Sequence, residues 1–156
     1  MSTTKTEIIH LIPTWKIKLL YDGECPLCLR EIRFLQKQDN QRGLVSLVDI
    51  AEQNYHPEEH GGVDYETAMG RIHAILPDGT IAKDIEAFRL VYEVLGLGWV
   101  YAITKFPVIE AIANLFYRIW AKLRLPLTRR PNLNILVAQR QQKQQNSRCK
   151  LNSCQD

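Results

Sequence analysis

Two cysteines three positions apart, in the segment YDGECPLCLREIRFL of residues 21–35, offer the clearest chemistry in this chain of 156 residues. Such a pair can be a redox dithiol, half of a metal site, or two inert buried thiols. The segment follows a short apolar run and opens a helical pattern, so Cys25 and Cys28 are expected where a strand meets a helix. A CxxC pair at such a junction in a β-α-β series favours the redox dithiol.

The predicted helix start makes the two thiols unequal. Cys25 is expected at or next to the helix N-cap, with Pro26 at the first helical position, where its missing N–H costs nothing. Free backbone N–H groups there stabilise an anion, so we expect a lowered pKa and an exposed, attacking thiolate at Cys25. Cys28, one turn further, should be less exposed and should resolve the mixed disulfide. Glu24 opposes the thiolate only modestly.

Asp22 ends the predicted strand and allows two interpretations. A desolvated, protonated Asp22 near Cys28 could pass a proton to or from the resolving thiol. Alternatively, Asp22 only forms a turn with Gly23 or caps the helix. The catalytic residues expected from the sequence are therefore Cys25, Cys28 and Asp22, and no cofactor or metal is required.

The sequence contains few good candidates for a second pair of metal ligands. Cys149 and Cys154 could complete four ligands with the CPLC pair, but they lie in a C-terminal segment poor in apolar residues. His56 and His60 are four positions apart, yet Pro57 stands between them, so we expect a polar loop there.

Strands and helices alternate around the dithiol. Residues 16–21 and 44–50 are short aliphatic runs predicted as strands, and the amphipathic helix between them should end before Gly43. Residues 51–68 are polar and could hold a short helix.

A hairpin and a covering helix follow in the predicted order. The Pro-Asp-Gly tripeptide at 77–79 should join two strands, at 71–76 and 80–83. Asp84 is expected to cap the next helix. The order β-α-β-(α)-β-β-α gives a mixed sheet with helices on its faces.

A further helix is predicted from about Pro107 to Arg124. Its apolar stripe is expected to face the core, with a membrane-surface or partner-binding face as the alternative. The stripe consists of Phe106, Ile109, Ile112, Ala113, Phe116, Ile119, Trp120 and Leu123.

The C-terminal end is basic and rich in glutamine. Nine of the 20 Lys and Arg residues lie at or after Arg118, where Asp156 is the only acidic residue. We expect a solvated, disordered tail that is dispensable from Gln139 onward. If this end has a partner, a membrane surface or an acidic protein is expected rather than a nucleic acid. The sequence shows no secretory signal and no long uncharged apolar run, so a cytoplasmic location is expected.

The segment KLLYDGECPLCLREIRFLQKQD resembles the opening motif of the DCC family of thiol-disulfide oxidoreductases, named for one Asp and two Cys. The resemblance covers about residues 16–125 and implies a thioredoxin-like fold, here with additional C-terminal helices. One departure is that residues 67–71 lack the proline that thioredoxin-like proteins place before the strand facing the dithiol, so substrate docking should differ. Further likeness lies in Asp78, Gly79, Asp84, Ala87 and the region from Tyr117 to Arg124.

These observations predict three parts: an N-terminal extension over 1–15, a thioredoxin-like domain with a helical extension over 16–130, and a tail over 131–156. The predicted activity is thiol-disulfide exchange with a disulfide-containing protein or a small thiol substrate, supplied with electrons by a thioredoxin- or glutathione-type donor. The glutathione link is kept because the proline inside CPLC resembles glutaredoxins. The alternatives are a non-enzymatic thioredoxin-like module with a basic docking helix, and a metal or iron–sulfur carrier.

Overall fold

Four strands form one mixed sheet in the order β2-β1-β3-β4 in the computed structural model, which describes residues 13–105 and 107–152. The central strand β1 pairs in parallel with β2 and antiparallel with β3, which pairs antiparallel with β4. The predicted strands, their order along the chain and the mixed sheet are thus confirmed. The strands are β1 (Ile17–Tyr21), β2 (Val45–Asp49), β3 (His73–Ile75) and β4 (Ile81–Lys83).

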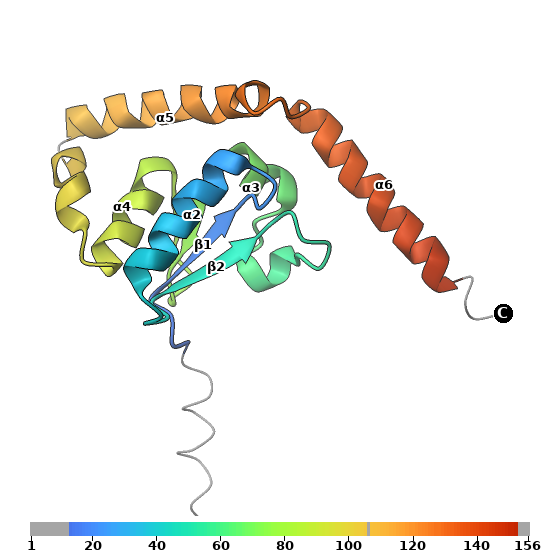
Figure 1. The fold of residues 1–156 in the computed structure, drawn as a ribbon, viewed down its shortest axis with the longest axis horizontal. Coiled ribbons are helices and arrows are strands. Elements are labelled where there is room, and N and C mark those ends of the chain that lie inside the picture. Colours follow the sequence, from blue (N-terminus) through green and yellow to red (C-terminus); the bar gives the residue numbers. More distant parts are fainter. Residues whose placement is uncertain (1–12, 106, 153–156) are drawn as a thin grey trace, which may run out of the picture.

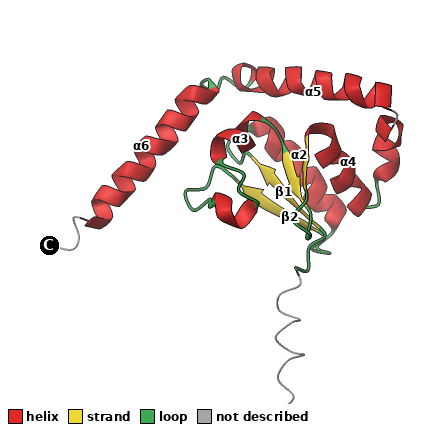
Figure 2. Cartoon of the chain, turned by 180° about the vertical axis from the view of Figure 1, so that it is seen from behind, coloured by secondary structure: helices red, strands yellow, loops and turns green. Residues whose placement is uncertain are grey.

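Helices cover both faces of the sheet (Figures 1 and 2). Successive residues of β1 point to opposite faces, so Leu19 and Leu20 belong to different cores. Leu19 packs in the core beneath α2 and α4, whereas Leu20 packs in the core beneath α3 and α6. The helices are α2 (Pro26–Asp39), α3 (Tyr65–Gly70), α4 (Asp84–Val94), α5 (Pro107–Leu127) and α6 (Leu133–Asn152).

The end of α2 fixes the return of the chain to the sheet. Asn40 adopts a left-handed conformation with φ of 47° and stops the helix before Gly43, as predicted. The buried Asp39 carboxylate then accepts hydrogen bonds from the backbone N–H groups of Gly43 at 2.9 Å and Leu44 at 3.1 Å. These bonds place the first residue of β2 beside β1.

The segment between β2 and β4 contains the elements that the sequence suggested. The short 3₁₀ helix η1 (Pro57–His60) and α3 lie in the polar stretch after β2. In the hairpin, Gly79 has φ of 87°, a conformation that favours glycine, and Asp78 accepts a hydrogen bond from Thr80 N at 2.8 Å.

The predicted capping role of Asp84 is wrong. The N-cap of α4 is Lys83, whose side chain makes no capping bond, and the Ile85 N–H instead donates to the Asn114 side chain of α5 at 3.3 Å. Asp84 is buried with φ of 56°, and its carboxylate lies 3.6 Å from the Arg71 guanidinium. The carboxylate is used in ion pairing, so a residue from another helix supplies the cap.

Helix α5, reached through the 3₁₀ helix η2 (Gly98–Lys105), crosses above α2 and α4 (Figure 1). Its buried residues are Tyr117, Ala121 and Arg124. The predicted apolar stripe therefore does not face the core: Phe116 is 69% exposed and Leu123 54% exposed. The inner face instead carries polar groups with defined partners on the body of the protein. Phe106 lies outside the described residues.

The segment predicted as a disordered tail forms α6 over its described part. Leu136 is buried in the core beneath α3. The Arg140 guanidinium donates to three backbone oxygens, those of Ile50 at 3.0 Å, Ala51 at 3.3 Å and Glu52 at 2.7 Å. Leu136 and Arg140 thus anchor the first half of α6, and the helix is polar over most of its second half. The proposed boundaries at residues 15 and 130 stay predictions.

Candidate active site

The dithiol lies at the start of α2, where the sequence predicted it. Cys25 is the N-cap residue, Pro26 occupies the first turn, and the Cys25 sulfur accepts a hydrogen bond from the Cys28 backbone N–H at 3.4 Å. The Cys25 N–H in turn donates to the Asp22 carbonyl at 3.2 Å. The turn after β1 therefore delivers the first thiol directly to the free N–H groups of a helix.

The turn needs a glycine because the end of β2 lies against it. Gly23 N donates to the Asp49 carboxylate at 2.8 Å, and a Cβ at Gly23 would lie 1.7 Å from the other carboxylate oxygen. The parallel pairing of β1 with β2 brings Tyr21 opposite Asp49, so this carboxylate reaches the turn after β1. Asp49 thus fixes the loop that leads to Cys25.

The two thiols differ in acidity in the predicted direction. Hydrogen bonding from the Cys28 side chain lowers the pKa of Cys25 to about 6, assisted by the Cys28 backbone N–H and the Arg124 charge and opposed by burial. The same hydrogen bond and burial raise the pKa of Cys28. One thiolate therefore forms at Cys25 and is stabilised by a protonated Cys28.

The predicted order of exposure is wrong. Cys25 is 1% exposed, whereas Cys28 is partly accessible. Arg130, in the connection between α5 and α6, bridges both sides of the dithiol turn by pairing with the buried Asp22 and with Glu24, the latter at 2.9 Å. The connection between the C-terminal helices is thus tied to the turn that leads to Cys25, which local sequence patterns do not reveal.

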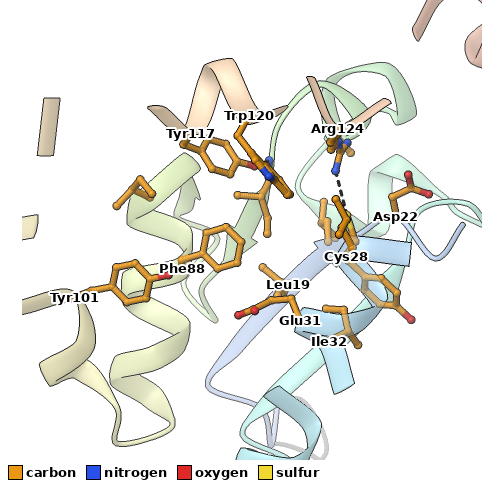
Figure 3. A pocket seen from close by; sticks show the side chains of 16 residues that line it. Leu19, Asp22, Cys28, Glu31, Ile32, Phe88, Tyr101, Tyr117, Trp120 and Arg124 are labelled. Atoms are coloured by element: carbon orange, nitrogen blue, oxygen red, sulfur yellow. Dashed lines mark hydrogen bonds between the residues drawn. The ribbon is translucent and has the colours of Figure 1, made fainter. Parts of the chain in front are cut away.

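Arg124 is a site residue that the sequence did not single out. It is 7% exposed, and its guanidinium lies 3.2 Å from the Cys28 sulfur (Figure 3). The guanidinium also donates to the Met69 carbonyl. It is separated from Cys28 by 96 positions. The family resemblance included the region from Tyr117 to Arg124, and an arginine on the face opposite an apolar stripe is the signal that could have found it.

Asp22 shows the turn-forming behaviour and also lies near the thiols. Its carboxylate is 2% exposed, accepts from Glu24 N at 3.1 Å and pairs with Arg130. Its negative charge contributes to raising the pKa of Cys28 and opposes the lowering of the pKa of Cys25. Its use as a proton carrier stays a prediction.

A cavity of about 350 Å³ opens beside the resolving thiol (Figure 3). Its polar lining comes from Asp22, Cys28, Glu31, Arg124 and tyrosine hydroxyls, and Cys25 is not among the lining residues. The Tyr92 hydroxyl donates to Glu31 at 2.7 Å and so fixes that carboxylate. The apolar lining includes Leu19, Leu20, Leu27, Ile32, Ala68, Ile72, Ile85, Phe88 and Trp120.

The side chains weighed as metal ligands lie apart from this site. His60 stacks on Tyr55 with ring centres 5.2 Å apart, and His56 lies 3.5 Å from the Glu58 carboxylate. Cys149 is exposed on α6, and Cys154 lies outside the described residues. Within the described part of the chain, no three His, Cys, Asp or Glu side chains gather as a metal site would require.

The sequence of this chain is similar to that of known proteins. An Arabidopsis thaliana protein, Uncharacterized protein At5g50100, chloroplastic, is 50% identical over 126 residues, which are 81% of this chain and 59% of that protein. The chain thus spans 59% of that relative's length. The relative's name describes that protein as chloroplastic, and the cytoplasmic location expected for this chain is not confirmed. No solved structure matches the chain. The sequence model of a family described as DCC1-like thiol-disulfide oxidoreductase matches residues 19–130, so the chain belongs to this family.

Proposed function

We propose that this protein is a thiol-disulfide oxidoreductase in which Cys25 attacks and Cys28 resolves. The observation that carries the proposal is the asymmetric hydrogen bonding at the start of α2, where both the backbone and the thiol of Cys28 stabilise a Cys25 thiolate. With a pKa of about 6, this thiol is mostly ionised at neutral pH, and the thiolate is the nucleophile in disulfide exchange. Family membership supports the same chemistry.

The reaction proceeds in two exchanges. The Cys25 thiolate attacks one sulfur of a substrate disulfide, so a mixed disulfide forms and the other substrate sulfur leaves as a thiolate. Cys28 then loses its proton and attacks Cys25, which releases the second substrate thiolate. The substrate gains two electrons, and Cys25 and Cys28 become a disulfide that a thioredoxin- or glutathione-type donor reduces again.

Arg124 assists the second exchange in this proposal. The hydrogen bond to the Cys25 thiolate is the largest cause of the raised pKa of Cys28, and it disappears when Cys25 enters the mixed disulfide. The Arg124 guanidinium, 3.2 Å from the Cys28 sulfur, remains and favours the Cys28 thiolate. Capture of the substrate thereby prepares the resolving thiol, and Asp22 beside it is the proposed acceptor of its proton.

Substrate docking requires a change at the cover over Cys25. The Cys25 thiol is 1% exposed, and the Arg130 bridge to Asp22 and Glu24 spans its turn. The Met69 carbonyl, near the place where thioredoxin-like proteins receive a substrate backbone, is already bonded by Arg124. We therefore propose that a disulfide-containing protein or a small disulfide reaches Cys25 when the Arg130 bridge opens.

The cysteine substitutions test this assignment. Cys28→Ser should accumulate mixed disulfides with substrate because nothing resolves them, and Cys25→Ser should abolish capture. Non-reducing gels and mass spectrometry of trapped species measure both, with Cys149→Ser on α6 as the matched control that behaves like the wild type. Trapping by the Cys25 variant alone would reverse the roles, and absence of trapping in every variant would remove the proposed activity.

A further inference from the structure

The apolar residues of α5 face away from the protein. Its outer face, defined here by Ile112, Leu115, Phe116, Ile119, Leu123 and Leu127, consists of large side chains that are each between 47% and 73% exposed. A surface helix normally turns such residues toward the core and its polar residues toward water. In α5 this arrangement is reversed.

Specific contacts on the inner face hold the helix in this orientation. Asn114 accepts from Ile85 N at the start of α4, and the Tyr117 hydroxyl accepts from Ile72 N at 2.9 Å. Two turns further on, Arg124 reaches the Cys28 sulfur and the Met69 carbonyl. Rotating α5 to bury its apolar residues would break all of these contacts, so the outer face stays exposed while the site is intact.

The exposed surface runs along most of α5, and the preceding 3₁₀ helix η2 also carries exposed apolar side chains. From Val108 to Leu127 the helix spans roughly 30 Å. Trp99 and Val100 in η2 are 75% and 40% exposed, and Trp120 lies at the edge of the outer face. Isolated exposed apolar residues are ordinary, but a continuous row of this length marks an interaction surface.

The charges beside the outer face are basic. Arg118 and Lys122, one helical turn apart, lie along one edge and are exposed, and Arg129 is exposed just after the helix. The Arg118 guanidinium also lies 3.9 Å from the buried Asp84 carboxylate, so Lys122 and Arg129 contribute most of the free positive charge. Glu110 is the only acidic residue between positions 107 and 132. A basic edge beside an apolar row with tryptophans at its margins is the pattern of a helix that lies in the interface of an anionic membrane.

We infer that the outer face of α5 docks on an anionic lipid surface, with the helix parallel to the membrane plane and the dithiol beneath it. Within the described residues, no helix is long and apolar enough to cross a bilayer, which is consistent with a helix that lies on it. This inference goes beyond the proposed redox function and does not depend on it, because it rests on exposure and charge alone.

A second copy of the chain fits the same face less well. In an antiparallel two-fold pairing through the outer face, the edge carrying Arg118 and Lys122 would meet the same edge of the other copy. Like charges would then face each other at close range, which is unfavourable. An anionic lipid surface supplies the opposite charge along the whole edge.

Flotation of the full chain with vesicles tests the inference. The wild type should float with vesicles of equal parts phosphatidylglycerol and phosphatidylcholine and should bind pure phosphatidylcholine at least tenfold more weakly. The double variant Phe116→Glu/Leu123→Glu should lose binding tenfold or more. Ile135→Glu, at an exposed apolar position of α6, is the matched control and should bind like the wild type.

Two charge-reversal variants show which part of the chain contacts the vesicles. Lys122→Glu should weaken binding to the anionic vesicles severalfold, whereas Lys143→Glu, an exposed position on α6, should have little effect. Equal losses in these two variants, or full binding by the double variant, would overturn the inference. Failure of the wild type to bind vesicles, with a dimer that Phe116→Glu/Leu123→Glu converts to a monomer, would assign the face to a second copy. Failure to bind without a dimer would also overturn it.

Discussion

The start of α2 and the C-terminal helices act on the same dithiol by different means. The turn after β1 and the first turn of α2 contribute backbone groups: the Cys28 N–H points at the Cys25 sulfur from three residues away. Helix α5 and its connection to α6 contribute charged side chains, with Arg124 at Cys28 and Arg130 at Asp22. In the proposed reaction, the local region determines which thiol ionises, and the remote region determines access to that thiol and the activation of Cys28.

This division assigns separate steps of the reaction to separate regions. Changes at the start of α2 should alter the nucleophile, whereas changes in the C-terminal helices should alter access, stability and resolution. The three substitutions below act on the remote region and leave the backbone around Cys25 in place.

The largest effect is expected from Arg130→Ala. The substitution leaves the Asp22 carboxylate buried without its guanidinium partner, and breaking a buried pair in this way destabilises a protein by about 3 kcal/mol. It should also uncover the Cys25 turn, so alkylation of Cys25 should accelerate. Denaturant unfolding and peptide mapping measure the two effects, with the neighbouring exposed Arg129→Ala as the control. Unchanged stability and unchanged Cys25 labelling would show that Arg130 does not hold the cover.

A smaller loss of stability is expected from Arg140→Ala. Its guanidinium bonds three carbonyl oxygens at the end of β2 and lies 4.3 Å from the centre of the Tyr65 ring. Removing these contacts should lower the free energy of unfolding by about 2 kcal/mol, because bonds to a charged donor are stronger than neutral ones. Lys143→Ala, one turn further on, should change little. If the free energy of unfolding of the Arg140→Ala variant equals that of the wild type, the sequence-based prediction that the tail is dispensable would stand.

The most specific effect is expected from Arg124→Met. Loss of the guanidinium should raise the pKa of Cys28 in the mixed disulfide, because the positive charge beside the sulfur favours the thiolate, so resolution should slow about tenfold. Formation of the mixed disulfide should slow less, because Cys25 keeps its hydrogen bonds from Cys28. Rapid-mixing measurements of both steps, with Lys122→Met as the control, separate them. Equal slowing of the two steps would indicate that Arg124 supports the fold and has no specific effect on Cys28.

The elements near the dithiol could be predicted because their signals are local. Alternating aliphatic strands, the Pro-Asp-Gly hairpin and the proline at the start of α2 each identify a structure within a few residues. The C-terminal helices could not be placed, because an apolar stripe indicates a helix and not the direction in which it faces. Phe116 and Leu123 face outward because Asn114 and Tyr117 have fixed partners on the body.

The features of the site that depend on neighbouring residues could be predicted, and those that depend on distant residues could not. The direction of the pKa difference between Cys25 and Cys28 agrees with the sequence-based prediction, but its largest cause is the hydrogen bond between the two thiols, whereas the prediction relied on the backbone N–H groups at the helix start. The contact between Arg124 and Cys28 joins positions about one hundred residues apart. No local pattern encodes such a contact, and none indicates that Cys25 is buried. Asp22 could be located at the end of β1, but its ion pair with Arg130 is of this long-range kind.

The pH dependence of Cys25 alkylation tests the central assignment most directly. The rate, followed by peptide mapping after brief iodoacetamide treatment, should rise with pH through a midpoint of about 6, because the thiolate forms above the pKa. Cys28 should stay largely unlabelled over the same range, since its pKa is raised. In Cys28→Ala the midpoint should move upward, because the largest cause of the lowered pKa is removed. A wild-type midpoint near the roughly 8.5 of an ordinary thiol, or faster labelling of Cys28, would contradict the account.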